Sequence, residues 1–250
     1  MAENKRYNNA GEGIETVTSS WTFEGISNIF DQHIEKSVPM YHEGHKLITG
    51  LTDYFVRKGS KIIDLGSSTG SLIKKISKHH NSLDNIDFYL VDEVEEMIKF
   101  SKKNLNKLNE EKTNTHKFNF ISKSIIDYDL PENTDLIFSI YTMQFISPSI
   151  RQLIINRIYS SLSWGSGFFF FEKMNGSDAR FNDILIQNYE DFKIDNGYSF
   201  DEIKAKQKSL RGVLKPFSLS GNLDLLSRAG FVDCEIIFSY GPFKGILAIK

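Results

Sequence analysis

The sequence predicts an α/β protein built on a seven-stranded, mostly parallel sheet that ends in an antiparallel hairpin. From Lys61 onward, short β-branched or aromatic runs alternate with longer amphipathic stretches, as expected for a parallel sheet covered by helices on both faces. Near the C-terminus, only Gly241 and Pro242 separate two apolar runs. Because this link is too short for a crossover helix, the last two strands must pair in an antiparallel hairpin.

Each element follows from its own pattern. The runs that read as strands are brief and rich in β-branched or aromatic residues, and they occupy 61–65, 86–91, 118–122, 134–140, 167–172, 232–240 and 243–250. The stretches that read as helices repeat apolar residues every three or four positions, and they occupy 71–80, 95–108, 149–162 and 222–231.

The order of these elements predicts four parts. Residues 1–60 form an N-terminal helical cap, with helices around 26–34 and 40–57 and Pro39 between them. Residues 61–173 form the ligand-binding α/β core, and residues 216–250 complete it with the last helix and the hairpin. Residues 174–215 form a helical insert, which we expect to cover the carboxyl ends of the strands, where ligands bind in open α/β sheets.

Composition limits the class of protein. The 250 residues are 40% hydrophobic and 25% charged, which suits one large globular domain. A net charge of −2 gives no indication of a nucleic-acid partner. The single cysteine, Cys234, excludes an intrachain disulfide and a cysteine metal cluster. We see no secretory signal and no apolar stretch near the ~20 residues of a membrane helix, so we expect a cytoplasmic protein without a membrane partner.

A glycine-rich turn follows the first strand of the core. It reads Asp64-Leu65-Gly66-Ser67-Ser68-Thr69-Gly70 and opens a helix. Gly66 and Gly70 allow the backbone to approach a ligand, and the helix N-terminus offers unpaired N–H groups. The spacing differs from the G-x-G-x-x-G of pyrophosphate binders. The alternative is a tight strand-to-helix turn with no ligand.

Polar residues follow the next two strands. Asp92 ends the second strand, where a carboxylate can accept hydrogen bonds from two ribose hydroxyls; the alternative is that Asp92 caps the next helix and Glu93 belongs to a solvated acidic run. Ser124 and Ile125 follow the third strand, with Asp127 just beyond. Ser124 or Asp127 could accept a hydrogen bond from an adenine N6.

Histidines and nucleophile motifs give weaker signals. His42 and His45 are three residues apart on a predicted helix, but this is not H-E-x-x-H and no third ligand is evident, so we expect no metal site. Both are expected at the surface, with general base as the minor interpretation. There is no G-x-S-x-G and no Walker A lysine, so hydrolase and nucleoside-triphosphatase functions lack support.

Several short segments stand in one order along the chain: Trp21-Thr22-Phe23, Ser37-Val38-Pro39 with Tyr41, Asp64-Leu65-Gly66, Met143-Gln144-Phe145, Glu172-Lys173, Asp191-Phe192-Lys193, Asn196-Gly197-Tyr198-Ser199 and Arg228-Ala229-Gly230-Phe231. With these segments the chain resembles, from about Trp21 to Lys250, the carboxy-S-adenosylmethionine synthase family, a branch of the class I S-adenosylmethionine-dependent methyltransferases. The resemblance implies a Rossmann-like sheet with a C-terminal hairpin, S-adenosylmethionine as cofactor and a homodimer.

The resemblance also assigns positions. Tyr41 matches the family's cofactor tyrosine, Gly66-Ser67-Ser68 its G-C-S turn and Asp92 its ribose aspartate. Glu93 stands where the family has asparagine, Ser124 replaces an aspartate at the adenine end, and a cofactor-contacting asparagine falls at Ile140.

The largest departure is Gln207, which stands where the family has the arginine that pairs with the extra carboxylate of the carboxylated cofactor. Losing such a guanidinium–carboxylate pair typically costs ~2–5 kcal/mol of binding. Lys206, Lys208 or Arg211 could compensate. We therefore expect Gln207 to lie at the cofactor but to bind no carboxylate.

These observations predict transfer of a methyl group from S-adenosylmethionine to a small-molecule acceptor. Tyr141, Glu172 and His42 are the candidates near the acceptor, with His42 as a remote general base. One alternative is the family's own reaction, which makes the carboxylated cofactor from S-adenosylmethionine and prephenate. The other is a non-catalytic S-adenosylmethionine-binding scaffold, suggested by the departures at Ser124, Ile140 and Gln207.

Overall fold

The computed structural model describes residues 8–9, 15–16, 30–110 and 116–250. The start of the predicted helix at 26–34 lies outside these residues; its described part is α1, Phe30–Ser37. Within the described chain, no helix is both long and apolar enough to cross a membrane.

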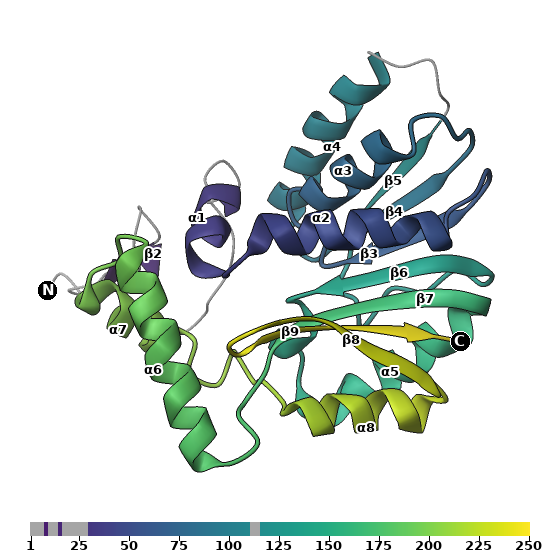
Figure 1. Cartoon of the computed structure of the whole chain (residues 1–250). Coiled ribbons are helices and arrows are strands. Elements are labelled where there is room, and N and C mark those ends of the chain that lie inside the picture. The colour runs from purple at the N-terminus through teal and green to yellow at the C-terminus, as the bar shows by residue number, and fades with distance from the viewer. Residues whose placement is uncertain (1–7, 10–14, 17–29, 111–115) are drawn as a thin grey trace, which may run out of the picture.

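A seven-stranded sheet forms the centre of the molecule (Figure 1). Its order is β5-β4-β3-β6-β7-β9-β8. Neighbours among β3 to β7 pair in parallel, whereas β9 runs antiparallel to both β7 and β8. The strands are β3 Lys61–Leu65, β4 Asp87–Asp92, β5 Lys117–Ser122, β6 Thr134–Ile140, β7 Leu162–Lys173, β8 Asp233–Tyr240 and β9 Phe243–Ile249. The predicted mostly parallel sheet and its terminal hairpin are confirmed.

Helices cover both faces of the sheet. On one side lie α2, α3 and α4, and on the other α5 and α8 (Figure 1). Their bounds are α2 Tyr41–Leu51, α3 Ser71–His79, α4 Glu95–Glu110, α5 Pro148–Ser161 and α8 Leu219–Ala229. The predicted helix at 40–57 is shorter than expected, since α2 ends at Leu51 and a 3-10 turn, η1 Thr52–Tyr54, follows it.

The four consecutive phenylalanines of β7 contribute to the hydrophobic clusters on both faces of the sheet. Phe168 and Phe170 pack with α5 and α8 side chains, whereas Phe169 and Phe171 pack with those of α2 and α3. All four are essentially fully buried. Because successive strand residues point to opposite faces, a continuous apolar run is what a central strand between two helical layers requires.

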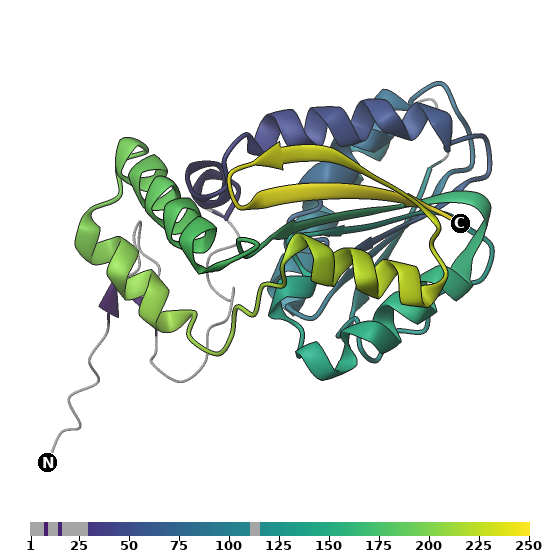
Figure 2. The same cartoon turned by 60° about the horizontal axis from the view of Figure 1, so that its bottom comes forward.

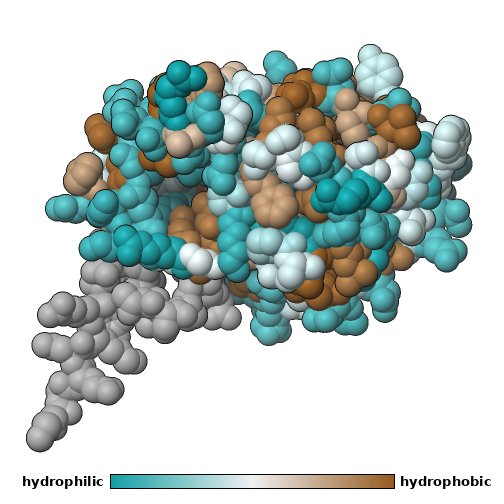
Figure 3. Space-filling model, turned by 90° about the horizontal axis from the view of Figure 1, so that it is seen from below, coloured by the Kyte–Doolittle hydropathy of each residue, from teal (hydrophilic) through white to brown (hydrophobic). Residues whose placement is uncertain are grey.

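Two helices lie beyond the carboxyl end of β7. They are α6, Ala179–Asp195, and α7, Phe200–Ser209, and both stand to one side of the sheet, near α1 (Figures 1 and 2). Asp178 caps α6 by accepting the Phe181 N–H, and Ser199 with Glu202 forms a capping box at α7. The predicted insert is therefore helical; its boundaries, like the four-part division, stay a prediction. Seen from below, hydrophobic side chains lie interspersed among hydrophilic ones (Figure 3).

Candidate functional site

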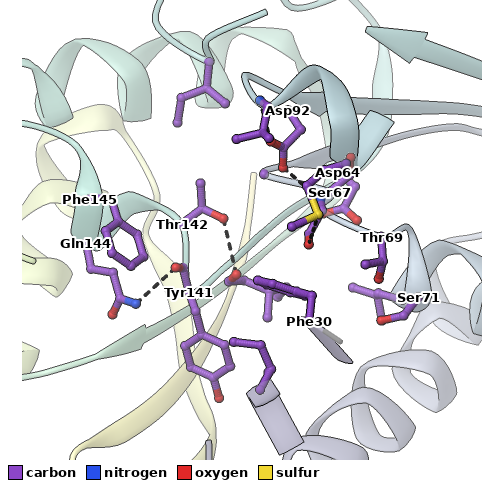
Figure 4. Close-up of a pocket in the computed structure, with 18 of the residues that line it drawn as sticks. Phe30, Asp64, Ser67, Thr69, Ser71, Asp92, Tyr141, Thr142, Gln144 and Phe145 are labelled. Atoms are coloured by element: carbon purple, nitrogen blue, oxygen red, sulfur yellow. Dashed lines mark hydrogen bonds between the residues drawn. The ribbon is translucent and has the colours of Figure 1, made fainter. Parts of the chain in front are cut away.

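A pocket of about 580 Å³ lies where β3, β4 and β6 end. Asp64, Ser67 and Asp92 stand at one end, and Tyr141, Gln144 and Phe145 stand at the other (Figure 4). Parallel strands bring these residues together because their carboxyl ends share one edge of the sheet. The predicted site residues that line the pocket are Tyr41, Asp64, Gly66, Ser67, Ser68, Asp92, Glu93, Ser124, Ile125 and Tyr141.

The glycine-rich loop is shaped for a close approach. Gly66 has φ +80°, and a Cβ there would overlap the Thr142 side chain. Ser68 also has positive φ, 48°, which costs a non-glycine residue energy and is held by its surroundings. The Ser67 Oγ is buried against the pocket and has no hydrogen-bond partner among the described residues. The backbone N–H groups of Gly66, Ser67 and Gly70 are already hydrogen-bonded within the chain. The unsatisfied Ser67 hydroxyl is therefore the group of this loop that suits a polar ligand.

Two carboxylates face the loop. The Asp92 carboxylate accepts the Ser68 N–H at 2.8 Å through one oxygen and the Val94 N–H at 2.9 Å through the other. Each oxygen keeps a lone pair for a ligand hydroxyl. Because α4 begins at Glu95, the bond from Val94 fixes the turn before the helix, and Asp92 is not its N-cap. Asp64 is buried, and burial together with the charge of Asp92 raises its pKa to about 7.

Two aromatic side chains of α2, Tyr41 and His45, line the pocket beside the start of α3. The Tyr41 and His45 rings lie 4.2 Å apart, and the Tyr41 hydroxyl hydrogen-bonds the Ser71 hydroxyl at 3.2 Å. His45 is only 4% exposed, so the prediction of a surface histidine was wrong for it. Burial and the charge of Lys75 lower the His45 pKa to about 3. Its neutral Nδ1 accepts a hydrogen bond from Lys75 at 3.2 Å.

The opposite end is formed by the loop after β6. Tyr141 has φ 58°, and its ring packs on Phe171 and Phe243 at centroid distances of 6.3 and 5.7 Å. Its backbone oxygen accepts the Gln144 amide N–H at 3.1 Å. Burial raises the Tyr141 pKa, so its hydroxyl stays protonated and can donate a hydrogen bond.

Four predicted site residues lie outside the lining. Gly70 sits behind the loop, where a Cβ would crowd Ser101 at 3.0 Å. His42 is exposed and pairs with Glu35 at 2.9 Å. The Gln207 amide donates to a Glu190 carboxylate oxygen instead of facing the pocket.

The fourth, Glu172, is 2% exposed. Burial raises its pKa well above the ordinary value, against the opposing effects of Arg151 and of backbone N–H groups in the 142–144 loop. Its Oε1 has no hydrogen-bond partner in the described chain. The carboxyl group thus lies beneath the loop that carries Tyr141 rather than in the pocket.

Four lining residues carried no signal in the sequence: Phe30, Met97, Thr142 and Phe243. His45 and Gln144 also line the pocket. The sequence pointed to His45 only as a surface histidine or minor general base, and to Gln144 only through a segment shared with the resembling family. The described residues also include a three-residue group of potential metal ligands, Asp53, His79 and His80, with donor atoms within 4.8 Å of one another. None of the three lines the pocket.

Known proteins match both the fold and the sequence. A methyltransferase-domain model matches residues 56–175. A putative S-adenosylmethionine-dependent methyltransferase from Methanococcus maripaludis aligns with TM-score 0.57 at 18% identity, over 100% of this chain and 97% of that one. Human N-acetylserotonin methyltransferase, solved with S-adenosylmethionine, aligns with TM-score 0.58 at 16% identity, over 94% of this chain and 61% of that one. The fold is that of the class I S-adenosylmethionine-dependent methyltransferases.

Relatives of higher sequence identity show the family to which the chain belongs. The carboxy-S-adenosyl-L-methionine synthase of Staphylococcus epidermidis is 36% identical over 235 residues, covering 92% of this chain and 97% of that protein. The synthase of Nautilia profundicola is 35% identical over 227 residues, covering 91% and 93%. The chain belongs to the carboxy-S-adenosyl-L-methionine synthase family.

Proposed function

We propose that the enzyme transfers a methyl group from S-adenosylmethionine to a small-molecule acceptor in this pocket. The observation that carries the proposal is the combination of an Asp92 carboxylate fixed by the Ser68 N–H with an open glycine turn beside it. The described lining contains no lysine or arginine, and Gln207 is directed to Glu190. This arrangement favours the unmodified sulfonium over one that carries a carboxylate.

Each cofactor residue then has a role. Asp92 accepts the ribose hydroxyls, assisted by Glu93. Gly66, Ser67 and Ser68 approach the methionine part, and Gly70 supports the turn from behind. Tyr41 covers the methionine end, and Asp64 lies beneath it.

Ser124 and Ile125 are proposed for the adenine. The Ser124 hydroxyl accepts the Ile126 N–H at 3.4 Å, so it can also donate to a ring nitrogen. Ile125 is 7% exposed and presents an apolar edge.

The chemistry requires positioning more than proton transfer. S-adenosylmethionine supplies an activated methyl group, which a nucleophile displaces in line from the sulfonium with release of S-adenosylhomocysteine. The Tyr141 and Phe243 rings would exclude water and hold the acceptor in line. The predicted roles of Glu172 and His42 remain proposals, and their positions outside the lining favour support of the loop and of α2.

The test is the identity of the nucleoside that the purified protein carries, measured by mass spectrometry. We expect S-adenosylmethionine or S-adenosylhomocysteine. If the protein purifies empty, calorimetric titration with S-adenosylmethionine should give saturable binding that Asp92→Ala weakens. No binding in either experiment would contradict the proposal and favour the scaffold alternative.

A second candidate is carboxy-S-adenosyl-L-methionine synthesis, favoured by relatives of that name that match nearly the whole chain. Because residue 207 is a glutamine, this reaction requires a cationic side chain at another position to bind the added carboxylate. Recovery of the carboxylated nucleoside would make this reaction primary. Recovery of S-adenosylmethionine alone, together with no product from prephenate, would exclude it.

We also propose a homodimer that works in the cytoplasm without a nucleic-acid partner. The resemblance supports the dimer, as do apolar side chains of α6 and α7 that are exposed in the monomer: Phe181, Ile184, Ile194 and Phe200. A lone cysteine, Cys234, is compatible with a reducing compartment. Light scattering during size-exclusion chromatography tests the dimer, and Ile184→Glu should release monomer.

A further inference from the structure

Two neighbouring helices end together on the side of the molecule away from the pocket. α2 and α3 lie side by side on one face of the sheet (Figure 1). At their starts, the Tyr41 hydroxyl hydrogen-bonds the Ser71 hydroxyl. Just beyond their ends, the Thr52 hydroxyl lies 2.7 Å from His80 Nε2. The two helices therefore run in the same direction, from the pocket to a common end.

Three potential metal ligands meet at this common end: Asp53 on η1, His79 at the end of α3, and His80 just after it. One donor atom from each lies within 4.8 Å of the other two. Asp53 Oδ1 lies 2.7 Å from His79 Nε2 and 3.9 Å from His80 Nε2. A tetrahedral zinc ion holds its ligand atoms at 2.0–2.2 Å, which places them about 3.3 Å from one another. The two observed separations lie on either side of this value, so side-chain rotation alone can enclose an ion.

Both imidazoles can turn a lone pair toward such an ion. The Thr52 hydroxyl donates to the Thr49 backbone oxygen at 2.5 Å, so it accepts from His80 Nε2. The Asp53 carboxylate likewise accepts from His79 Nε2. A neutral imidazole carries its proton on either nitrogen, so transfer of each proton to Nδ1 frees both Nε2 atoms for a metal. Burial lowers the pKa of His80, against the opposing effect of Asp53, which keeps its ring neutral at pH 7.

The surroundings of the three ligands favour a cation that arrives from solvent. The carboxyl ends of α2 and α3 both lie here, and the carboxyl end of a helix carries partial negative charge. Among the residues that the structure describes, the Asp53 carboxylate forms ion pairs with the two histidines and with no lysine or arginine. The side chains of Asp53 and His79 are 57% and 38% exposed, whereas that of His80 is 6% exposed. The site thus combines one ligand held in place by Thr52 with two that an ion can reach.

We propose that Asp53, His79 and His80 bind a zinc ion, with water in the fourth position, and that the ion joins the end of α2 to the end of α3. Two imidazoles and one carboxylate suit Zn²⁺, whereas Mg²⁺ and Ca²⁺ prefer oxygen ligands. None of the three residues lines the pocket. The ion therefore acts on stability and not on methyl transfer: it fastens together the helix that carries Tyr41 and the helix that follows the glycine-rich loop.

The test is titration of the untagged full chain with Zn²⁺ by isothermal titration calorimetry, after a chelator has removed any metal. We expect one saturable site per chain, with an affinity for Zn²⁺ about 100-fold or more above that for Mg²⁺. Saturating Zn²⁺ should also raise the Tm, because an ion that binds the folded chain stabilises it. No saturable Zn²⁺ binding, or equal affinity for Mg²⁺, would overturn the proposal.

Variants of the two exposed ligands locate the ion. His79→Gln and Asp53→Asn should each weaken Zn²⁺ binding at least tenfold and remove most of the gain in Tm. The matched controls are His42→Gln, at an exposed histidine of α2, and Asp84→Asn, at an exposed aspartate. Both controls should change the Zn²⁺ affinity less than twofold. Unchanged affinity in both His79→Gln and Asp53→Asn, or an equal loss in His42→Gln, would overturn the proposal.

A spectroscopic readout separates a three-ligand site from loose binding at the surface. Co²⁺ replaces Zn²⁺ in such sites, and four-coordinate Co²⁺ absorbs visible light far more strongly than six-coordinate Co²⁺. We expect the wild type to give the strong four-coordinate spectrum with one equivalent of Co²⁺, and His79→Gln to lose it. A weak six-coordinate spectrum in the wild type would show an ion held mainly by water and contradict the proposal.

Discussion

The Ser68 backbone N–H donates to an Asp92 carboxylate oxygen at 2.8 Å, which joins the glycine-rich loop after β3 to the end of β4. The other Asp92 oxygen accepts the Val94 N–H at 2.9 Å. One carboxylate thus holds the strained Ser68 backbone and the entry to α4, while its remaining lone pairs face the pocket. Structural support and ligand binding are combined in the same side chain.

Asp92→Asn should weaken binding of S-adenosylmethionine about 10- to 100-fold, or ~1.5–3 kcal/mol, as expected when a hydrogen bond to a charged group is lost. Asparagine keeps the shape but offers only one acceptor oxygen. The measurement is isothermal titration calorimetry. Asp87→Asn, at the opposite end of the same strand, is the control and should leave the affinity within twofold. Equal losses in both variants would place the effect in the strand and not in ribose binding.

Gly66→Ala should reduce both stability and cofactor affinity, because its Cβ would overlap Thr142 and its φ is +80°. Positive φ alone costs about 1–2 kcal/mol, and overpacking adds about 1–3 kcal/mol. Gly59→Ala is a matched control, with φ +81° and nothing within 4 Å of the added Cβ. The free energy of unfolding in urea, measured for both variants, separates the cost of positive φ from the cost of the overlap with Thr142. A loss in Gly66→Ala no larger than in Gly59→Ala would contradict the steric argument.

The raised pKa of Asp64 gives stability a pH dependence. Burial and the charge of Asp92 raise this pKa from the ordinary carboxyl value of 3.8 to about 7 in the folded state. The folded protein therefore binds a proton that the unfolded chain has released, so the contribution is complete below about pH 4 and is lost as the pH rises through about 7. Asp64→Asn should gain stability relative to wild type between pH 5 and 8, by at most about 4 kcal/mol. The measurement is the free energy of unfolding in urea at several pH values. The same change of this free energy with pH in both proteins would contradict the assignment.

Glu172→Gln and Glu172→Ala should have opposite effects on folding. The buried carboxyl group has a pKa well above the ordinary value because of burial, so a neutral amide of the same shape should match or exceed wild-type stability at pH 8. Alanine leaves a cavity under the 142–144 loop and should cost about 2–4 kcal/mol. Chemical denaturation measures both. Affinity for S-adenosylmethionine should stay within twofold in Glu172→Gln; a large loss there would contradict the purely structural role and place Glu172 at the ligand.

The strand pattern was predictable because local chemistry and burial agree along the core. The run at 134–140 is observed as β6, Thr134–Ile140, and the two-residue link at Gly241 and Pro242 joins the antiparallel β8 and β9. The places of Asp64 and Asp92 at the ends of two successive predicted strands were equally informative. Parallel strands place both carboxylates at one edge, whatever the intervening helix does.

Side-chain direction outside the strands was harder to predict. His45 is buried while His42, on the same helix, is exposed. The spacing of His45 from Tyr41 and Ile48, which puts the three on one helix face, was the available sign. Gln207 was expected at the cofactor, but its side chain is taken by Glu190, a partner 17 residues earlier on α6.

The sequence by itself determined the class I sheet, its hairpin, the glycine-rich loop and the carboxylate that follows β4, because each depends on periodicity or short-range spacing. Only the tertiary structure decided which residues face the pocket and that Asp53 lies beside His79 and His80. Asp53 follows α2 and the histidines stand at the end of α3, so their proximity depends on how the two helices pack side by side. Contacts between segments that are distant in sequence do not appear as a repeating pattern of residues, so they could not be predicted from the sequence.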